Sequence, residues 1–251
     1  MQLLKKQNLL PLLLSIIFCS TIVTAQNSVT LNGSADFVNR YVWRGLLVND
    51  APNIQPSLSV SYSGFDFGFW GSYALTKINN SENDFGVSQE IDTWLSYSFQ
   101  LGKEINFSAL LTDYYFPQSG IKIGNFSNYD NPNGAGAHTL EIGFSLSGNK
   151  TFPLSFSGYI NIYNDKGRNS YFEINYPVSV SNYVGDVFIG AAGGSKDNPD
   201  YYGTANFNVI NLGFKIQREI KISTDFSIPL SVSYILNPRA EISYLIFGLS
   251  I

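Results

Sequence analysis

Hydrophobic and polar side chains alternate residue by residue along most of this chain. In residues 53–63, apolar side chains such as Leu58 and Val60 fill the even positions, and serine fills four of the odd ones. After Gly64 the alternation resumes with Phe65, Phe67 and Phe69. A period of two is typical of a β-strand with one apolar face and one polar face. The chain is therefore predicted to consist almost entirely of two-faced strands.

The pattern predicts about twelve strands, separated by connections of alternating length. The strands are expected at 29–44, 53–63, 65–75, 88–101, 104–116, 138–148, 153–163, 170–180, 184–193, 206–221, 225–236 and 240–251. Short turns alternate with longer polar loops at 46–52, 76–87, 117–137, 164–169 and 194–205, and the hairpin near Asn237 is the exception. Outer-membrane barrels have an even number of strands, short periplasmic turns and long extracellular loops. We predict an all-β, transmembrane, antiparallel up-and-down barrel over residues 26–251.

The N-terminal segment predicts export from the cytoplasm. Lys5 and Lys6 precede an apolar stretch at 9–23, and small residues at 23–25 offer a cleavage site before Gln26. This is the pattern of a signal peptide over residues 1–25. The stretch is short for a membrane anchor, which needs roughly 20 apolar residues. We expect the mature chain in the outer membrane of a Gram-negative bacterium.

Composition excludes several classes of protein. A mean hydropathy of +0.00 is too low for a helical membrane protein, whereas a barrel exposes only alternate residues to lipid. The net charge of −4 argues against a nucleic-acid partner. The single cysteine, Cys19, lies within the predicted signal, so the mature chain lacks disulfides and sulfur ligands. We expect no metal site and no cofactor.

Parity assigns side chains to the two faces of the barrel. The residues expected to face lipid are Phe37, Tyr41, Trp43, Leu58, Tyr62, Phe67, Phe69, Leu95, Tyr97, Phe144, Ile160, Ile174, Leu212, Phe214, Leu230 and Val232. Aromatic residues near strand ends, as in the girdles of membrane barrels, are Tyr41, Trp43, Tyr62, Phe65, Tyr234 and Tyr244.

The opposite parity places charged residues in the outer half of the lumen. The belt consists of Arg40 and Arg44 on the first strand and, further round, the carboxylates Glu90, Asp92, Glu141 and Glu173, with the uncharged Gln55 at the same level. Opposed charges at a constriction would filter solutes. Alternatively, arginine–carboxylate pairs with Trp70 and Trp94 would fill a narrow barrel. Twelve strands lie between the filled interior of roughly eight strands and the channel of roughly sixteen, so both interpretations stay open.

Residues 34–45, Ser-Ala-Asp-Phe-Val-Asn-Arg-Tyr-Val-Trp-Arg-Gly, resemble the opening signature of the TorF family of porin-like outer-membrane barrels. Further blocks fit in order, and the resemblance covers roughly residues 30–116. These blocks are Pro52-x-Ile54-Gln55-Pro56, Gly64-Phe65, Gly68-x-Trp70-Gly71-Ser72, Glu90-Ile91-Asp92 with Tyr97, and Asp113-Tyr114-Tyr115. The resemblance implies a porin-like barrel and brings no catalytic mechanism.

No pattern of residues indicates an enzyme. His138, the only histidine, lies at the end of the longest predicted loop and is expected to be solvated. A serine hydrolase needs a histidine oriented beside its serine, and no hydrolase motif surrounds His138. Glu90 and Asp92 share one face of a strand and are expected to pair structurally with arginines. We expect no enzymatic activity.

The sequence therefore predicts an outer-membrane porin that allows passive diffusion of small solutes through a polar lumen. The alternative is a closed barrel that acts as a structural or surface-interaction protein, and a third class is a secreted, glycan-binding β-protein. The expected partners are outer-membrane lipids, small solutes and the assembly machinery. The alternation of Phe247, Leu249 and Ile251 is similar to the terminal strand that this machinery recognises.

Overall fold

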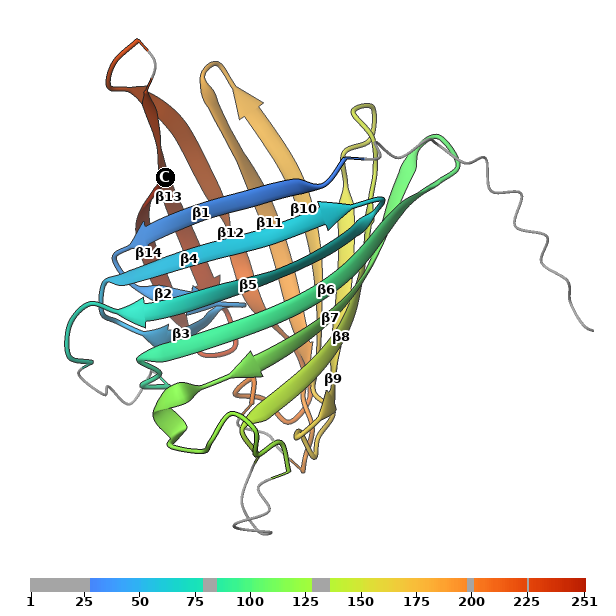
Figure 1. Ribbon diagram of the computed structural model, residues 1–251, viewed down its shortest axis with the longest axis vertical. Helices are drawn as coiled ribbons and strands as arrows, with labels where there is room; N and C mark the ends of the chain where they lie inside the picture. The colour runs from blue at the N-terminus through green and yellow to red at the C-terminus, as the bar shows by residue number, and fades with distance from the viewer. Residues whose placement is uncertain (1–27, 79–84, 128–135, 198–200, 225) are drawn as a thin grey trace, which may run out of the picture.

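The computed structural model describes residues 28–78, 85–127, 136–197, 201–224 and 226–251. Within these residues, twelve antiparallel strands close into one barrel (Figure 1), which confirms the predicted fold. Its strands are β1 (Thr30–Val38), β4 (Asn53–Tyr62), β5 (Phe65–Ala74), β6 (Gln89–Leu101), β7 (Ile105–Tyr115), β8 (His138–Ser147), β9 (Ser155–Tyr163), β10 (Ser170–Val180), β11 (Tyr183–Gly193), β12 (Phe207–Lys221), β13 (Ser227–Asn237) and β14 (Ile242–Ser250). The predicted signal peptide falls outside the described residues.

The two ends of the barrel differ in the length of their connections. The turns β4–β5, β6–β7, β8–β9, β10–β11 and β12–β13 lie at one end, which we call the short-turn end. The longer connections lie at the other end, the long-loop end, together with the short β13–β14 turn after Asn237. The loop between β7 and β8 contains a one-turn helix, η1 (Pro117–Ser119). In the described ranges, no helix is long and apolar enough to cross a membrane.

The outer face of the barrel is apolar and exposed around its whole circumference. Leu58, Phe67, Leu95, Ile174 and Phe214 were predicted to face outward, and each is at least 40% exposed. Further exposed apolar residues continue the surface on the remaining strands, among them Leu111, Ile142, Ile160, Val187, Ile189, Leu212, Leu230, Val232, Leu245 and Phe247. The barrel therefore turns its apolar face to the outside.

Polar side chains occupy much of the inner wall and pair across neighbouring strands. Ser61 donates to Asp66 over 2.6 Å, and Ser98 and Ser108 share a hydrogen bond of 2.6 Å. Ser250 donates to Asp36 at the seam where β1 meets β14. The serine face seen in the sequence is therefore the wall of the lumen.

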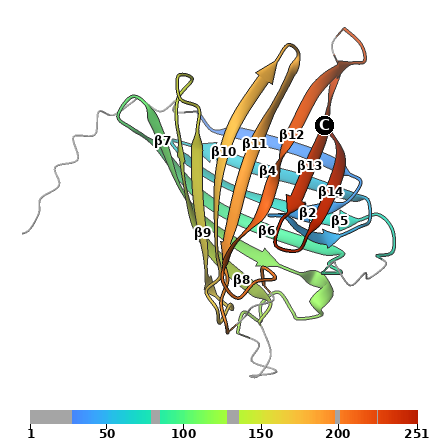
Figure 2. The ribbon, with the colours of Figure 1, turned by 180° about the vertical axis from the view of Figure 1, so that it is seen from behind.

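The predicted strand over 29–44 is wrong beyond Val38. Residues 41–49 form a separate hairpin of β2 (Tyr41–Trp43) and β3 (Leu46–Asn49) that lies inside the barrel. Figures 1 and 2 show it between β4–β6 on one side and β12–β14 on the other. We call residues 41–49 the plug hairpin. The expected polar loop at 46–52 is thus in part a buried strand.

The local sequence explains why the chain leaves the wall. The amide nitrogen of Asn39 donates to the carbonyl oxygen of Phe247, and the Asn39 side chain accepts from the Phe247 amide, which ends the pairing of β1. Arg44 and Gly45 then form a two-residue turn with φ of 49° and 79°. Two positive φ angles are typical of the tight turn that suits a twisted hairpin. Apolar and polar residues continue to alternate through residues 39–44, so this pattern did not distinguish a longer wall strand from a hairpin.

Both faces of the plug hairpin are apolar because protein surrounds it. On one face, Trp43 and Leu46 pack against Tyr171, Tyr202 and Ile210. On the other face, Val42 and Leu47 pack against Phe188, Ile235 and Tyr244. Tyr41, Trp43 and Tyr244 were expected on the outer face and lie in the lumen instead. The predicted aromatic girdle keeps Tyr62, Phe65 and Tyr234, which are exposed.

Two asparagines fix the point where the hairpin returns to the wall. The Asn53 amide donates to Asn49 Oδ1 over 2.8 Å and to the carbonyl oxygen of Ala51 over 2.7 Å. Asn49 in turn donates to the carbonyl oxygen of Val87 over 2.7 Å. Asn49 and Asn53 are almost completely buried, and buried amides are stable only when they are hydrogen-bonded. These contacts hold the base of the hairpin.

Gly45 lets the hairpin tip dock on β12. The ladder between β11 and β12 shifts register beside Ile210, and such a bulge re-aims a side chain and frees backbone groups. A Cβ atom on Gly45 would lie 1.9 Å from the Ile210 carbonyl oxygen. From β13, the Asn237 amide donates to the Gly45 carbonyl oxygen over 3.1 Å. Only glycine fits this contact.

We predict that Gly45→Ala destabilises the barrel by about 2 kcal/mol or more, because it combines strain at positive φ with overlap against Ile210. Urea unfolding in lipid vesicles measures the change. The control is Gly102→Ala, since Gly102 also has a positive φ but a Cβ atom there meets nothing within 4 Å. Equal losses in the two variants would contradict the docking of the hairpin tip on β12.

Candidate functional site

Arg44, at the tip of the plug hairpin, reaches across the lumen to Glu141 on β8. Its two terminal nitrogens donate to Glu141 Oε2 over 2.6 Å and to Oε1 over 2.9 Å. The Arg44 side chain is 10% exposed and that of Glu141 is 1% exposed. An ion pair in which both terminal nitrogens of an arginine bind the two oxygens of one carboxylate is strong and directional. It fixes the hairpin to the opposite wall.

Aromatic rings surround the same guanidinium group. Its central carbon lies 4.4 Å from the ring centroid of Trp43, 4.3 Å from that of Tyr159 and 4.7 Å from that of Tyr171. Arg44 also donates to the Tyr202 hydroxyl over 2.7 Å. Burial raises the pKa of Tyr202 to about 12, so this hydroxyl stays neutral. Cation–π contacts are stronger where water is excluded, as it largely is here.

The plug hairpin also contacts the wall on its other sides. The rings of Tyr41 and Trp70 on β5 are 5.5 Å apart, and those of Trp43 and Tyr114 on β7 are 5.9 Å apart. Within β3, the backbone carbonyl of Leu47 accepts a hydrogen bond from the Phe85 amide, and that of Val48 accepts one from the Val87 amide. The hairpin therefore narrows the lumen from several directions.

A cavity lies on each side of the hairpin. The larger cavity, about 490 Å³, is lined by mid-strand and short-turn-side residues that include Ser96, Leu110 and Ser157. The smaller cavity, about 300 Å³, is lined by long-loop-end residues that include Phe85, Phe116 and Thr139. Trp43 and Tyr114 line both cavities. These two rings therefore form a partition between the two halves of the lumen.

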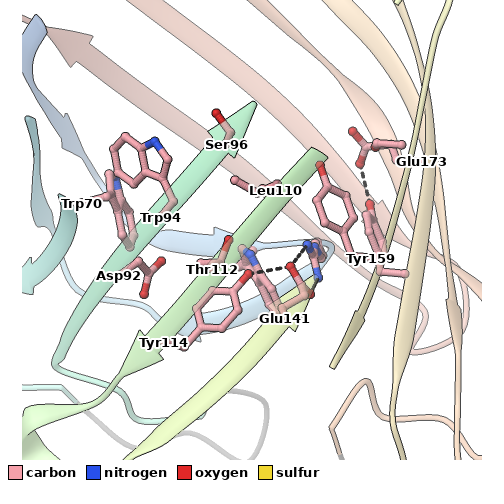
Figure 3. Close-up of a pocket in the computed structure, with 14 residues that line it drawn as sticks. Trp70, Asp92, Trp94, Ser96, Leu110, Thr112, Tyr114, Glu141, Tyr159 and Glu173 are labelled. Atoms are coloured by element: carbon pink, nitrogen blue, oxygen red, sulfur yellow. Dashed lines mark hydrogen bonds and ion pairs between the residues drawn. The ribbon is translucent and has the colours of Figure 1, made fainter. Parts of the chain in front are cut away.

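Charged and aromatic side chains share the lining of the larger cavity. Figure 3 shows Trp70, Trp94 and Asp92 on one side of it and Tyr159 and Glu173 on the other. Trp94 is held by a hydrogen bond of 2.6 Å from its ring nitrogen to Asp66 Oδ2. The cavity thus presents flat rings beside carboxylates, with Arg44 and Glu141 between its two sides.

The structure brings most residues of the predicted belt together, although the arginines and the carboxylates do not face each other from two sides of the barrel wall. Arg44, Asp92, Glu141 and Glu173 line the larger cavity with Trp70 and Trp94, whereas Glu90 lines the smaller one. Gln55 lies on the wall of β4 and donates to Ser72. Arg40 and Arg44 were expected on the first strand, but Arg40 lies in the bend before β2 and Arg44 at the hairpin tip. Because Arg44 lies on the hairpin and not on the wall, it forms a direct ion pair with Glu141.

Sequence reasoning missed the aromatic partners of Arg44. Tyr114 lies in the block Asp113-Tyr114-Tyr115 and donates to Glu141 Oε1 over 2.9 Å. Tyr159 and Tyr171 occupy inward positions of predicted strands, so parity alone could have found them. Tyr202 comes from the loop between β11 and β12, where the sequence has no periodic pattern. Two adjacent tyrosines, Tyr201 and Tyr202, in an otherwise polar loop were the one feature of the sequence that could have suggested a buried contact there.

His138 was expected to be a solvated loop residue, and that prediction is wrong. It is 4% exposed and stacks on Phe126 with ring centroids 3.8 Å apart. Its Nδ1 lies 2.8 Å from Asp113 Oδ1, and its Nε2 contacts the carbonyl oxygen of Ile123. These contacts fold residues 116–127 against the barrel end. Among the described residues, no group of three histidine, cysteine or acidic side chains could hold a metal ion.

We predict that Arg44→Met destabilises the barrel by about 3–5 kcal/mol, because it leaves Glu141 buried without its cation. The second change Glu141→Gln should restore part of the loss. Arg218→Met is the matched control: Arg218 is exposed and, among the described residues, contacts the Tyr183 hydroxyl and ring, so its loss should cost less than about 1 kcal/mol. Urea unfolding midpoints measure all variants, and equal costs for Arg44 and Arg218 would refute the clamp.

Comparisons with known proteins identify a family for this chain. No curated protein sequence matches the chain. One similar solved structure is a KdgM porin, with 10% sequence identity and a TM-score of 0.46, covering 86% of this chain and 97% of that one. A family model described as "Bacterial protein of unknown function (Gcw_chp)" matches residues 23–235. The chain therefore belongs to the Gcw_chp family of bacterial proteins.

Proposed function

We propose that this protein is an outer-membrane barrel through which small solutes diffuse, with the plug hairpin as its constriction. The observation that carries the proposal is the inverted distribution of polarity. Apolar side chains cover the outside of a closed barrel, whereas charged, hydroxyl and aromatic side chains line the larger interior cavity. In this reading no catalytic step, cofactor or nucleic acid takes part.

The outer face supports insertion in a membrane. Soluble monomers rarely expose contiguous apolar patches of more than a few hundred Å², and here exposed aliphatic and aromatic residues continue around the strands. A closed barrel satisfies its backbone hydrogen bonds within the wall, which lipid requires. The short-turn end would face the periplasm and the long-loop end the outside. A signal peptide at 1–25 and recognition by the assembly machinery complete this route.

The partition supports restricted rather than free passage. Trp43 and Tyr114 line both cavities, so a solute that moves from one cavity to the other would contact these rings. The blocks that resemble the TorF family converge here, since they contain Arg44, Trp70, Asp92 and Tyr114.

The alternative, a closed barrel with a structural or surface role, also has a specific observation in its favour. The hairpin is fixed by a buried ion pair and contacts several strands of the wall. If the rings at the partition do not move, the lumen stays shut. Conductance separates these two functions.

We predict that the expressed protein is recovered in the outer-membrane fraction and stays there after washing with urea. Detergent-extracted protein should migrate faster on a gel before heating than after, because a folded barrel resists the detergent. Recovery of the protein in solution without detergent would instead support a secreted β-protein.

We predict that Trp43→Ala increases conductance in planar bilayers several-fold over the wild-type barrel, because it removes a ring of the partition. The matched control is Phe69→Ala, which removes a ring from the outer face and should leave conductance unchanged. A barrel in which residues 40–50 are replaced by a short glycine–serine linker should conduct most. If none of these barrels conducts, the proposed passage is wrong and the closed-barrel function is favoured.

A further inference from the structure

We propose that the larger cavity binds small organic cations, amines or guanidines, as the preferred solutes of the lumen. This inference rests on the proposed function only in naming the solute, since binding itself needs no passage. Three properties of the cavity carry it: its charge balance, its aromatic lining and its volume.

The charge balance of the lining is negative. Arg44 is the only cation among the cavity's lining residues, and Glu141 takes both terminal nitrogens of its guanidinium group. Among the described residues, neither Asp92 nor Glu173 forms an ion pair with a cation. Glu173 accepts hydrogen bonds from the Tyr171 hydroxyl and the Asn211 amide, which supply no charge. The lining would therefore attract positive solutes and repel anions.

Asp92 is the less satisfied of the two carboxylates. Its Oδ1 atom is buried and has no hydrogen-bond partner among the residues that the structure describes. A carboxylate removed from water is costly unless it is paired. No ion pair to Asp92 forms within the described part of the chain, and the cavity that Asp92 lines is where a cation could approach its other oxygen.

The rings beside Asp92 suit a cation. Trp70 is directly opposite Asp92 in the β5–β6 ladder, and Trp94 follows two residues later on the same face. Figure 3 shows both indoles next to the carboxylate. Trp94 is held by Asp66 and lies close over Gly68, where a Cβ atom would come within 2.4 Å of the ring. Indole faces attract cations, and these rings are fixed before any solute arrives.

The same cavity already contains a cation held by aromatic rings and a carboxylate, namely the Arg44 side chain. The Arg44 guanidinium lies over three rings of the lining and against one carboxylate. Trp70, Trp94 and Asp92 repeat that combination of flat rings and a carboxylate with the cation missing. A volume of about 490 Å³ falls in the usual range for small-molecule sites. A diamine or a guanidino compound would fit both the chemistry and the size.

Tryptophan fluorescence tests the inference directly, because all three tryptophans of the chain line this cavity. Detergent-folded protein at low salt is titrated with putrescine, with 1,4-butanediol as the neutral analogue and succinate as the anionic one. Glucose tests for binding of a neutral sugar. We expect a saturable change with putrescine and none with the other three solutes.

Variants locate the binding. Asp92→Asn should weaken putrescine binding by roughly tenfold, since it removes a charge-assisted contact. Glu173→Gln should weaken it less, because Glu173 is already hydrogen-bonded. Asp186→Asn is the matched control, since Asp186 lies on the inner face of β11 and outside the lining of this cavity, and it should bind as the wild type does. Heat-modifiable migration confirms that each variant is folded.

The outcomes separate the two proposals. Saturable binding of putrescine that depends on Asp92 supports this inference even if the barrel never conducts. A conducting barrel that binds putrescine no better than butanediol overturns it and leaves the passage of solutes intact. Preferential binding of glucose or succinate, or equal binding by the Asp92→Asn and Asp186→Asn variants, also overturns it.

Discussion

The buried ion pair between Arg44 and Glu141 determines the internal organisation of this barrel. Without it, nothing charged would hold the hairpin tip across the lumen, and Glu141 would be a buried anion with no cation. With it, Trp43 is placed against Tyr114, and the lumen is divided into two cavities. The pair also decides the charge of the larger cavity, because it neutralises the only cation in the lining. The proposed constriction and the proposed preference for cations thus depend on the same contact.

The barrel accommodates the hairpin through complementary features of distant strands. The bulge at Ile210 on β12 offers a carbonyl against which only glycine can pack. Phe188, Ile235 and Tyr244 give the lumen an apolar sector that matches Val42 and Leu47. A twelve-stranded wall leaves more room than an eight-stranded one, whose side chains fill the interior. The plug hairpin takes up part of that room and is stabilised as a small hydrophobic core of its own.

The alternation of apolar and polar residues was sufficient to predict the strands of the barrel wall but not the plug hairpin. The alternation at 53–75 correctly predicted β4 and β5, and the inward positions of Trp70, Asp92, Glu141 and Glu173 followed from the same period. That period also continued through residues 39–44, so the chain was expected to remain in the wall. Contacts in the folded barrel decide between a longer wall strand and a hairpin. A turn at Arg44-Gly45 becomes favourable because Glu141 and Ile210 lie opposite it. His138 was misplaced for a similar reason, since its stacking on Phe126 comes from a loop without periodicity.

A crosslink between the hairpin and the far wall would test its position most directly. Leu46 on the hairpin and Ala192 on β11 belong to one buried cluster, and Cys19 is the only native cysteine. In the folded barrel, the double variant Leu46→Cys/Ala192→Cys should form an intramolecular disulfide on mild oxidation, whereas Leu46→Cys paired with Phe69→Cys on the outer face should not. Its absence, together with rapid labelling of Cys at position 46 by a membrane-impermeant thiol reagent added from outside, would contradict a hairpin held within the lumen.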